Sequence, residues 1–377
     1  MLFEKLRELL DLYFPKVRQS RKKAKDKDWI TNGIKRAIRQ KNSLFQVQLK
    51  YNTKYNVERY KKYRNLLNKI IKNTQRDYYK NLIKQHNNNC TGLWKTLGNI
   101  ICNRKRETKI NKLNVNNKIL NDPIQIANTM NNYFTNIGPD LAKKFENCTD
   151  KRYMKFMGES NKQSMYMFKT NPNEIFKLIK NLKNKKSSGF DEISAKFLKL
   201  CAPYVSTPLA NIFNASISKG VYPDLLKTAR VTPIYKKGVK SDPGNYRPIS
   251  VLSQVNKVFE KILHKRLYKY LSKFKILYEY QFGFREGHST TQALVEITDR
   301  LKKAIDEKML TCGIFIDLTK AFDTVDHAIL LDKMYNYGIR GNVHNLFKSY
   351  LSNRQQYVKV NNANSDMKPV KCGVPQG

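Results

Sequence analysis

An α+β fold preceded by a mostly helical basic region is predicted by two features of the sequence. From about residue 190 onward, turn signals, short apolar runs and helical patterns alternate, which is typical of domains that mix helices and strands. Before that point, long stretches carry apolar residues at helical spacing. We therefore expect a basic helical linker region at 1–110, a helical linker at 111–185 and the mixed domain at 186–377.

Charge is the strongest signal in the composition. The 377 residues include 72 Lys and Arg against 30 Asp and Glu, a formal net charge of +42. Such an excess repels itself in the folded protein unless a polyanion offsets it, which indicates a nucleic-acid partner. A second explanation accounts for part of the excess, because Lys, Asn, Ile and Tyr are all abundant, as expected of an A+T-rich coding sequence.

The cysteines and the hydropathy pattern indicate an intracellular protein. The six cysteines are scattered without a C-x-x-C pair, so they predict reduced thiols and no zinc site. No apolar run approaches the ~18 residues of a membrane span, and no signal peptide is recognisable, so we expect no membrane partner. The basic run at 21–25 suits nuclear import, phosphate contacts or a solvated face, which leaves nucleus and cytoplasm as expected locations.

The first 84 residues are the most basic part, with 24 Lys and Arg against 7 acids and a net charge of +17. Residues 55–84 contain no glycine or proline and predict one long amphipathic helix. We expect its tyrosines to pack inward, although base stacking on them is the alternative. Basic residues of this helix, together with one arginine of a later loop, are predicted to bind nucleic acid: Lys61, Lys62, Arg64, Lys69, Lys72 and Arg285.

Residues 312–327, CGIFIDLTKAFDTVDH, combine a short apolar run with three acids. The run at 313–316 predicts a buried strand that ends at Asp317. A carboxylate in that position is costly unless a cation or a hydrogen-bond donor meets it, and Asp is a ligand that suits Mg²⁺. The alternative is that Asp317 caps the following helix, with Asp323 and Asp326 as surface acids.

Two further local patterns concern elements near this segment. A helix is expected to begin near Pro123, and the pair Gly138–Pro139 is expected to end it. Residues 230–235 predict a strand with its proline toward a sheet edge, followed by a basic turn at 236–238.

About the last 190 residues resemble the reverse transcriptase of non-LTR (LINE-type) retrotransposons, of the jockey-like kind. No single block is specific, but seven occur in the family's order with family-like spacing. The first 180 residues are similar to the linker that joins an apurinic-type endonuclease to the polymerase in those elements. The seven blocks lie at 186–191, 231–238, 245–252, 259–262, 281–293, 315–327 and 373–377.

The resemblance implies a right-hand polymerase with fingers and palm, copying RNA into DNA by two-metal nucleotidyl transfer. Its partners would be an RNA template, a DNA primer and deoxynucleoside triphosphates. Asp317 would be the catalytic first palm carboxylate that ligates both Mg²⁺ ions, and Leu318 would lend its backbone carbonyl.

The same resemblance implies a set of nucleotide-binding residues. Arg247 would clamp the triphosphate, a bidentate task that suits a guanidinium, with Lys236 or Lys237 as a second phosphate contact. Phe322 would lie beneath the sugar and exclude a 2′-hydroxyl, the group that distinguishes RNA precursors from DNA precursors. Gln376 would lie against the incoming nucleotide.

The chain departs from the family in two places. Residues 187–192 read SSGFDE where the family has Ser-Pro-Gly-Pro-Asp-Gly, so we expect a looser turn. The family's Ala-Asp-Asp box and its thumb have no counterpart after 373–377, so we expect an incomplete fold with a partial palm and no polymerase activity by itself. The alternative is a catalytically inactive nucleic-acid-binding remnant. The motifs GHST at 287–290 and KAFDTVDH at 320–327 resemble those of an intron maturase or a retron polymerase less well.

Overall fold

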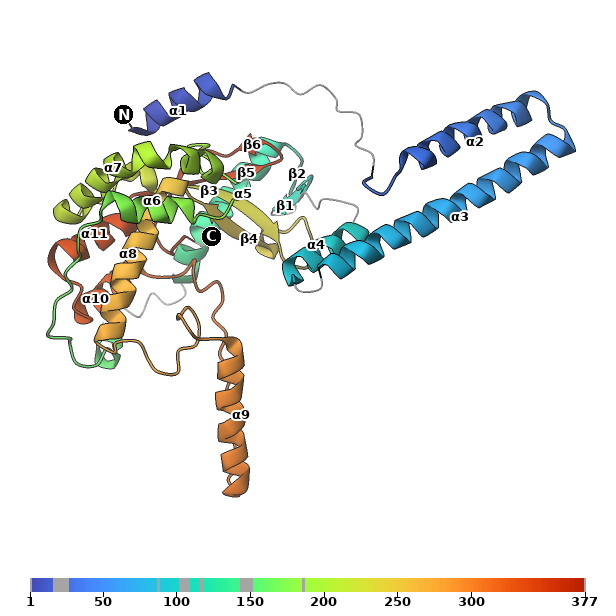
Figure 1. Cartoon of the computed structure of the whole chain (residues 1–377). Helices are drawn as coiled ribbons and strands as arrows, with labels where there is room; N and C mark the ends of the chain where they lie inside the picture. Colours follow the sequence, from blue (N-terminus) through green and yellow to red (C-terminus); the bar gives the residue numbers. More distant parts are fainter. Residues whose placement is uncertain are drawn as a thin grey trace. The chain divides into compact units, whose positions relative to one another are not determined.

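The computed structural model describes residues 2–15, 27–86, 89–101, 109–115, 118–142, 152–184 and 187–375 (Figure 1). The chain divides into a smaller unit, Phe14–Glu107, and a larger unit formed by Met1–Tyr13 with Thr108–Gly377. This division differs from the expected limits at 110 and 185. The first helix and residues 111–185 join the larger unit because their apolar side chains share its cores.

The smaller unit is helical and consists of α2 (Asn32–Lys50), α3 (Lys54–Gln85) and α4 (Cys90–Ile101). The hydroxyls of Thr31 and Thr53 cap α2 and α3 by accepting hydrogen bonds from backbone N–H groups of the first turn. The ring of Tyr60 lies 5.3 Å from that of Phe45, so this tyrosine packs between the two helices as expected. The five basic residues predicted on α3 are all exposed.

The larger unit is built on a five-stranded sheet with β3 (Thr228–Tyr235) near its centre. β3 pairs antiparallel with β4 (Tyr246–Val251) and parallel with β5 (Arg354–Val360). The β5 pairing ends at Val231, so Pro233 has a neighbouring strand on one side only, as a residue without an N–H requires. β5 also pairs with β6 (Ala363–Asn364) and β7 (Lys368–Val370), and a separate hairpin joins β1 (Leu113–Val115) to β2 (Lys118–Leu120).

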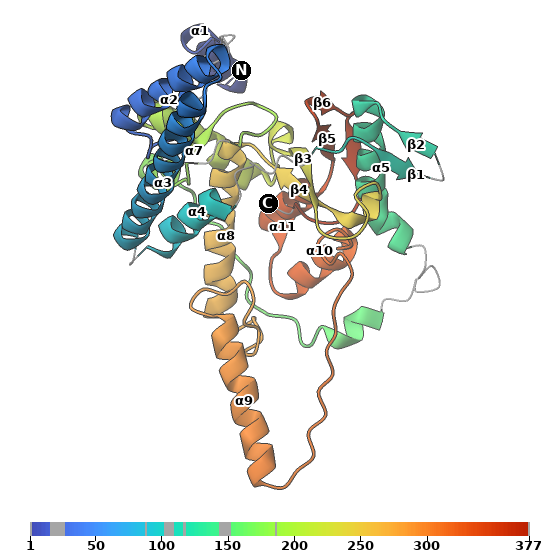
Figure 2. The same ribbon diagram turned by 90° about the vertical axis from the view of Figure 1, so that its right-hand side faces the viewer.

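Helix α5 (Pro123–Ala142) covers this sheet over β5 and β6, as Figures 1 and 2 show. Its residues Ile126, Met130 and Phe134 recur at helical spacing and are buried. They share one hydrophobic core with Val231 of β3 and Val358 of β5. The predicted helix is therefore present because its apolar face covers the sheet.

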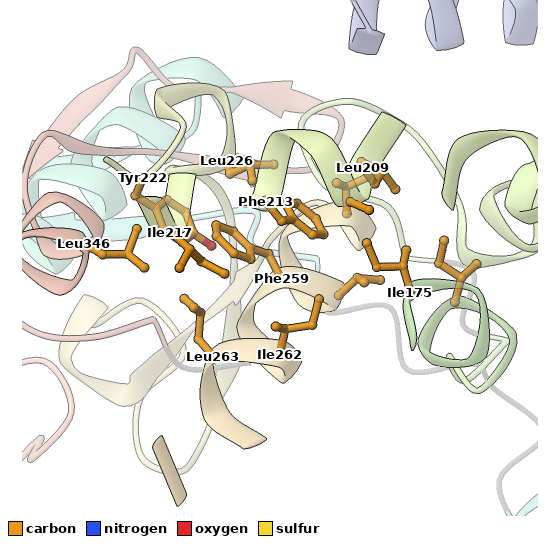
Figure 3. Packing of buried hydrophobic residues seen from close by; sticks show 14 of the residues in the cluster. Ile175, Leu209, Phe213, Ile217, Tyr222, Leu226, Phe259, Ile262, Leu263 and Leu346 are labelled. Carbon is orange, nitrogen blue, oxygen red and sulfur yellow. The ribbon is translucent and has the colours of Figure 1, made fainter. Parts of the chain in front are cut away.

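A second core lies among helices (Figure 3). The ring of Phe259 stacks on Phe213 at 4.3 Å and on Tyr222 at 5.0 Å, and all three are fully buried. The Tyr222 hydroxyl donates to Asn256 Oδ1 at 2.5 Å, which satisfies its polar end. The contributing helices are α1 (Leu2–Tyr13), α6 (Pro172–Lys180), α7 (Ala195–Lys219), α8 (Gln254–Lys273), α10 (His327–Asn336) and α11 (Gly341–Leu351).

Short 3-10 turns and one isolated helix complete the described elements. The turns are η2 (Arg152–Phe156), η3 (Asp224–Leu226) and η4 (Pro243–Asn245), and the helix is α9 (Thr290–Asp306), which buries none of its residues. Among the helices of the described ranges, none combines the length and the apolar composition that crossing a bilayer requires.

The predicted buried strand at 313–316 is wrong. The segment is extended but pairs with no other strand of the described residues, and Figure 2 draws it as a plain trace after α9. Phe315 is 96% exposed, and Ile314 and Ile316 are each 83% exposed. A strand needs a neighbour for its backbone N–H and C=O groups, and without one the apolar run cannot be buried.

Residues 187–192 pack beneath the start of α8. A Cβ on Gly189 would lie 2.6 Å from the backbone nitrogen of Ser253, so only glycine fits there. Burial raises the pKa of the Asp191 carboxyl, which accepts a hydrogen bond from the Ile193 N–H at 3.2 Å. Glu192, which stands where the family has glycine, has a φ of 58° in the left-handed region. The departure from the family therefore places a non-glycine residue in a conformation that favours glycine.

We expect Glu192→Gly to stabilise the larger unit by about 1 kcal/mol, because it removes the left-handed strain of a Cβ. Thermal unfolding of the whole chain measures the change. Glu192→Ala is the matched control, since it removes the same carboxylate but keeps the Cβ. A Glu192→Gly midpoint no higher than that of Glu192→Ala would contradict the strain argument.

Candidate functional site

Two segments that are distant in sequence are joined by backbone hydrogen bonds at the edge of the sheet. The N–H of Gly373 donates to the carbonyl of Val325 at 2.8 Å, and that of Val374 donates to Phe322 at 2.8 Å. The His327 ring adds a hydrogen bond from Nε2 to the carbonyl of Gly373 at 2.7 Å. The segments 322–327 and 372–375, both singled out from the sequence, therefore form one local structure.

Helix α5 contacts this structure closely at Gly138. A Cβ on Gly138 would lie 2.1 Å from Cys372 Sγ and 2.6 Å from the carbonyl oxygen of Asp323. The prediction that Gly138–Pro139 ends the helix is wrong, because α5 continues through both residues to Ala142. Here the glycine gives room for a tertiary contact, and the proline removes only one backbone donor near the end of the helix.

The loop at 281–288 reaches the same structure through one aromatic contact. The rings of Phe284 and Phe322 meet edge to face with centroids 5.9 Å apart. Within the loop, Arg285 Nη1 donates to the carbonyls of Tyr278 at 2.8 Å and Glu279 at 3.2 Å. Arg285, predicted to bind nucleic acid, therefore already binds the backbone of its own loop.

Asp317 and Leu318 lie in the exposed extended segment that precedes this structure. The Asp317 carboxylate makes no hydrogen bond or ion pair with another residue of the described ranges. Helix α10 is capped instead by Asp326, whose Oδ1 accepts from the N–H groups of Ala328 at 2.8 Å and Ile329 at 3.0 Å. The alternative in which Asp317 is the helix cap is therefore excluded.

Asp323 is not a surface acid. Burial raises the pKa of its carboxyl, and the charge of Lys320 opposes that shift. It lines a small cavity of about 40 Å³ together with Arg354, which is 3% exposed and has a buried Nη2 without a hydrogen-bond partner among the described residues. The alternative in which Asp323 is a surface acid is excluded, because residues of α5, β5 and 372–375 line the same cavity and leave the carboxyl partly buried.

The predicted nucleotide-binding residues lie on β4 and on the turn that joins β3 to β4. Arg247 is exposed on β4 opposite Ile234, and Lys236 and Lys237 are exposed on the turn. The Lys236 N–H donates to the carbonyl of Asn245 at 2.9 Å and closes the turn. Gln376 lies outside the described residues, as do Lys186 of the first block and the basic run at 21–25.

Comparison with known proteins gives one family match. A family model described as "Reverse transcriptase (RNA-dependent DNA polymerase)" matches residues 234–377, which include the last two residues of β3, all of β4 and both hydrogen-bonded segments. Residues 234–377 belong to the reverse transcriptase family. The match begins inside β3 and covers the end of that strand together with β4, β5, β6 and β7.

Curated relatives agree with this assignment. The chain is 36% identical over 205 residues to the probable RNA-directed DNA polymerase from transposon BS of Drosophila melanogaster, covering 54% of the chain and 22% of the relative. It is 33% identical over 205 residues to the RNA-directed DNA polymerase from mobile element jockey of the same species, with the same coverage of both chains. The chain thus spans about a fifth of the length of these relatives.

A longer match reaches the N-terminal part. The putative 115 kDa protein in the type-1 retrotransposable element R1DM of Drosophila melanogaster is 25% identical over 311 residues, covering 82% of the chain and 28% of the relative. The resemblance to non-LTR retrotransposon reverse transcriptases is therefore confirmed.

One contact between helix α5 and the matched range, which joins Tyr133 to Lys320, was not predicted from the sequence. Lys320 Nζ donates to the hydroxyl of Tyr133 at 2.7 Å and lies 4.5 Å from the centre of its ring. The pair joins α5 to the segment that follows Asp317. Tyr133 carried no signal beyond its place on the predicted helix, because only the fold brings it to a residue 187 positions away.

We expect Gly138→Ala to destabilise the larger unit by about 1–3 kcal/mol, because the new methyl group overlaps Cys372 and the backbone of Asp323. Gly98→Ala, in the interior of α4 with no atom within 4 Å of its Cβ, is the matched control. It should be neutral or stabilise by up to about 1 kcal/mol, since alanine is the better helix former. Urea unfolding of both variants measures the difference, and equal effects would contradict the close approach.

Proposed function

We propose that the chain is part of an RNA-directed DNA polymerase of a LINE-type mobile element, which copies an RNA template into DNA. The observation that carries the proposal is the family match over 234–377, in which segments 322–327 and 372–375 are hydrogen-bonded together. In this proposal β3, β4 and their turn belong to the fingers, and the two bonded segments belong to a palm. The catalytically inactive nucleic-acid-binding remnant remains the alternative.

Asp317 and Leu318 are the proposed Mg²⁺ ligands. Both are exposed, and the Asp317 carboxylate has no competing partner among the described residues, which suits a ligand. No group of three or more His, Cys, Asp or Glu side chains in the described part of the chain could hold a metal ion. One carboxylate fits an ion that usually keeps several waters and substrate phosphates as its other ligands. When bound, Mg²⁺ would supply charge neutralisation at the transferred phosphate.

The proposed nucleotide contacts follow from the fingers turn and the palm segment. Arg247 would hold phosphate oxygens in a bidentate manner, and Lys236 and Lys237 add positive charge on the adjoining turn. Phe322 is 38% exposed and held by Phe284, so one side of its ring faces solvent beneath a proposed sugar position. Gln376, in the segment that follows Val374, is proposed to lie against the nucleotide.

The test is photolabelling of the whole chain by a radioactive 4-thio-deoxythymidine triphosphate, in the presence of a DNA primer on an RNA template and Mg²⁺. Labelling should require Mg²⁺ and fall about tenfold or more in Arg247→Ala and in Asp317→Asn, because each change removes a charge-assisted contact. Arg300→Ala, which removes an exposed arginine of α9, is the control. Equal labelling of all four proteins would reject the proposal.

The smaller unit supports a second function, which is binding of a nucleic-acid backbone. Residues 32–85 contain fifteen Lys and Arg but only two acids, Glu58 and Asp77. The one ion pair found on α3 within the described residues joins Arg76 to Asp77 at 4.0 Å. Lys61, Lys62 and Arg64 are exposed on one half of α3, and Lys69 and Lys72 on the other. Such an unneutralised surface favours phosphates.

Simultaneous alanine substitution of Lys61, Lys62 and Arg64 should make RNA binding less dependent on salt. Each lost phosphate contact lowers the slope of log K against log[salt] by about 0.7–0.9, so we expect a decrease of about 2. Fluorescence anisotropy across a salt series measures it. Alanine substitution of Lys302 and Lys303 on α9 controls for net charge, and an equal decrease there would contradict a role for α3.

A further inference from the structure

A groove lined by both apolar and polar side chains runs along α5 in the larger unit, apart from the residues discussed as metal or triphosphate contacts. It has a volume of about 830 Å³. One face of α5 forms its floor, from Thr129 to Leu141, and its walls are β1, the turn at Pro243 and the segment at Thr319–Lys320. The twelve helical rises between Thr129 and Leu141 make this floor about 18 Å long.

The groove holds a lysine that is fixed in place without being neutralised. Lys320 Nζ donates to the Tyr133 hydroxyl at 2.7 Å and lies over the Tyr133 ring at 4.5 Å. A phenol and a ring face orient the ammonium group but leave it its full charge. Because the side chain is already ordered, a bound anion does not incur the entropy cost of immobilising it.

Three acids around the groove are partly buried, hydrogen-bonded within their own turn or distant along the helix from Lys320. Asp323 acts on Lys320 electrostatically, but it is partly buried and its pKa is raised by that burial. Asp242 accepts hydrogen bonds from the Gly244 N–H at 2.7 Å and from Asn245 Nδ2 at 3.2 Å within its own turn. Asp140 lines the groove seven residues beyond Tyr133, about 10 Å along the helix. The end of the groove at Lys320 is therefore positive.

Two side-chain amides extend the same surface. Asn132 and Asn136 are exposed one helical turn apart and both line the groove. Neither amide group is hydrogen-bonded to another protein atom within the described ranges. Each amide can donate and accept, which matches the edges of nucleobases as well as phosphate and sugar oxygens.

The position of the groove links two parts of the proposed polymerase site. A Cβ on Gly244 would lie 3.3 Å from the Tyr133 hydroxyl, so the turn that carries Lys236 and Lys237 closes against Tyr133. Asn114 of β1 holds the same turn by donating its N–H to the carbonyl of Ser241 at 2.8 Å. At the other wall, Lys320 follows Asp317 by three residues.

We propose that this groove binds one single-stranded segment of nucleic acid, with a backbone phosphate on Lys320 and the amides of Asn132 and Asn136 along the strand. The proposal rests on the proposed function and adds a site to it. A floor that is one helix wide, about 10–12 Å with its side chains, suits a single strand, and single strands present the base edges that amides recognise.

The experiment is zero-length crosslinking of the whole chain to short oligonucleotides that carry 4-thiouridine, or 4-thiothymidine in a DNA arm, followed by mapping of the crosslinked peptide. The crosslink should map to 129–141 or 319–320. It should fall about tenfold in Lys320→Ala, which loses a charged contact, and persist in Lys320→Arg. The RNA and DNA arms show which strand is preferred.

Matched variants distinguish a loss of crosslinking at the groove from an effect of net charge and from misfolding. Lys302→Ala removes an exposed lysine from α9 and should leave the α5 crosslink unchanged, while Tyr133→Phe, which keeps the ring and loses the hydroxyl, should lower it less than Lys320→Ala does. Thermal midpoints confirm that the variants fold, and Lys320→Arg answers the question if Lys320→Ala unfolds.

Two results would overturn the proposal that the groove binds a single strand. The first is crosslinks that map only to other segments. The second is an α5 crosslink that is as strong in Lys320→Ala as in the unchanged protein, or as strong with a duplex as with a single strand. These results are independent of nucleotide photolabelling at Arg247. If photolabelling succeeds while the α5 crosslink is absent, the polymerase proposal stands and the groove is rejected. If the α5 crosslink depends on Lys320 while photolabelling fails, the groove stands as a nucleic-acid site without the proposed activity.

Discussion

The close approach of three chain segments at Gly138 is the constraint on which the candidate site depends. Helix α5 can lie against Asp323 and Cys372 only because residue 138 has no Cβ. The same contact region contains the backbone hydrogen bonds that tie 322–325 to Gly373 and Val374. The segments of the reverse transcriptase domain are thereby anchored to a helix that precedes the family match by about a hundred residues.

This anchoring explains the contrast between neighbouring parts of one motif. Residues 320–327 contact α5, Gly373 and the start of α10, and Asp323 within them is partly buried. Asp317 and the apolar run before it stay exposed. A metal ligand must be both accessible to the ion and fixed in position. In this structure Asp317 is accessible because it is exposed.

Positive charge is distributed differently in the two units. On α3 of the smaller unit, exposed basic residues far outnumber acids, so a backbone of phosphates is the natural complement. In the larger unit, single cations are held by specific neighbours: Lys320 by Tyr133, and Arg354 by the ring of Tyr350 at 4.9 Å. The first arrangement favours affinity without sequence preference, and the second favours a defined path for a strand.

The sequence alone predicted the long helix at 55–84, the start of α5 near Pro123 and the strand at 230–235, because their apolar residues repeat at 3.6 or 2 positions and the flanking turns carry glycine, proline or asparagine. It also identified the family through ordered motifs. The apolar run at 313–316 misled the prediction, because a strand depends on a partner that periodicity does not reveal. The continuation of α5 through Gly138–Pro139, the partial burial of Asp323 and the Lys320–Tyr133 contact were decided only by tertiary structure, since each depends on residues far apart in the chain.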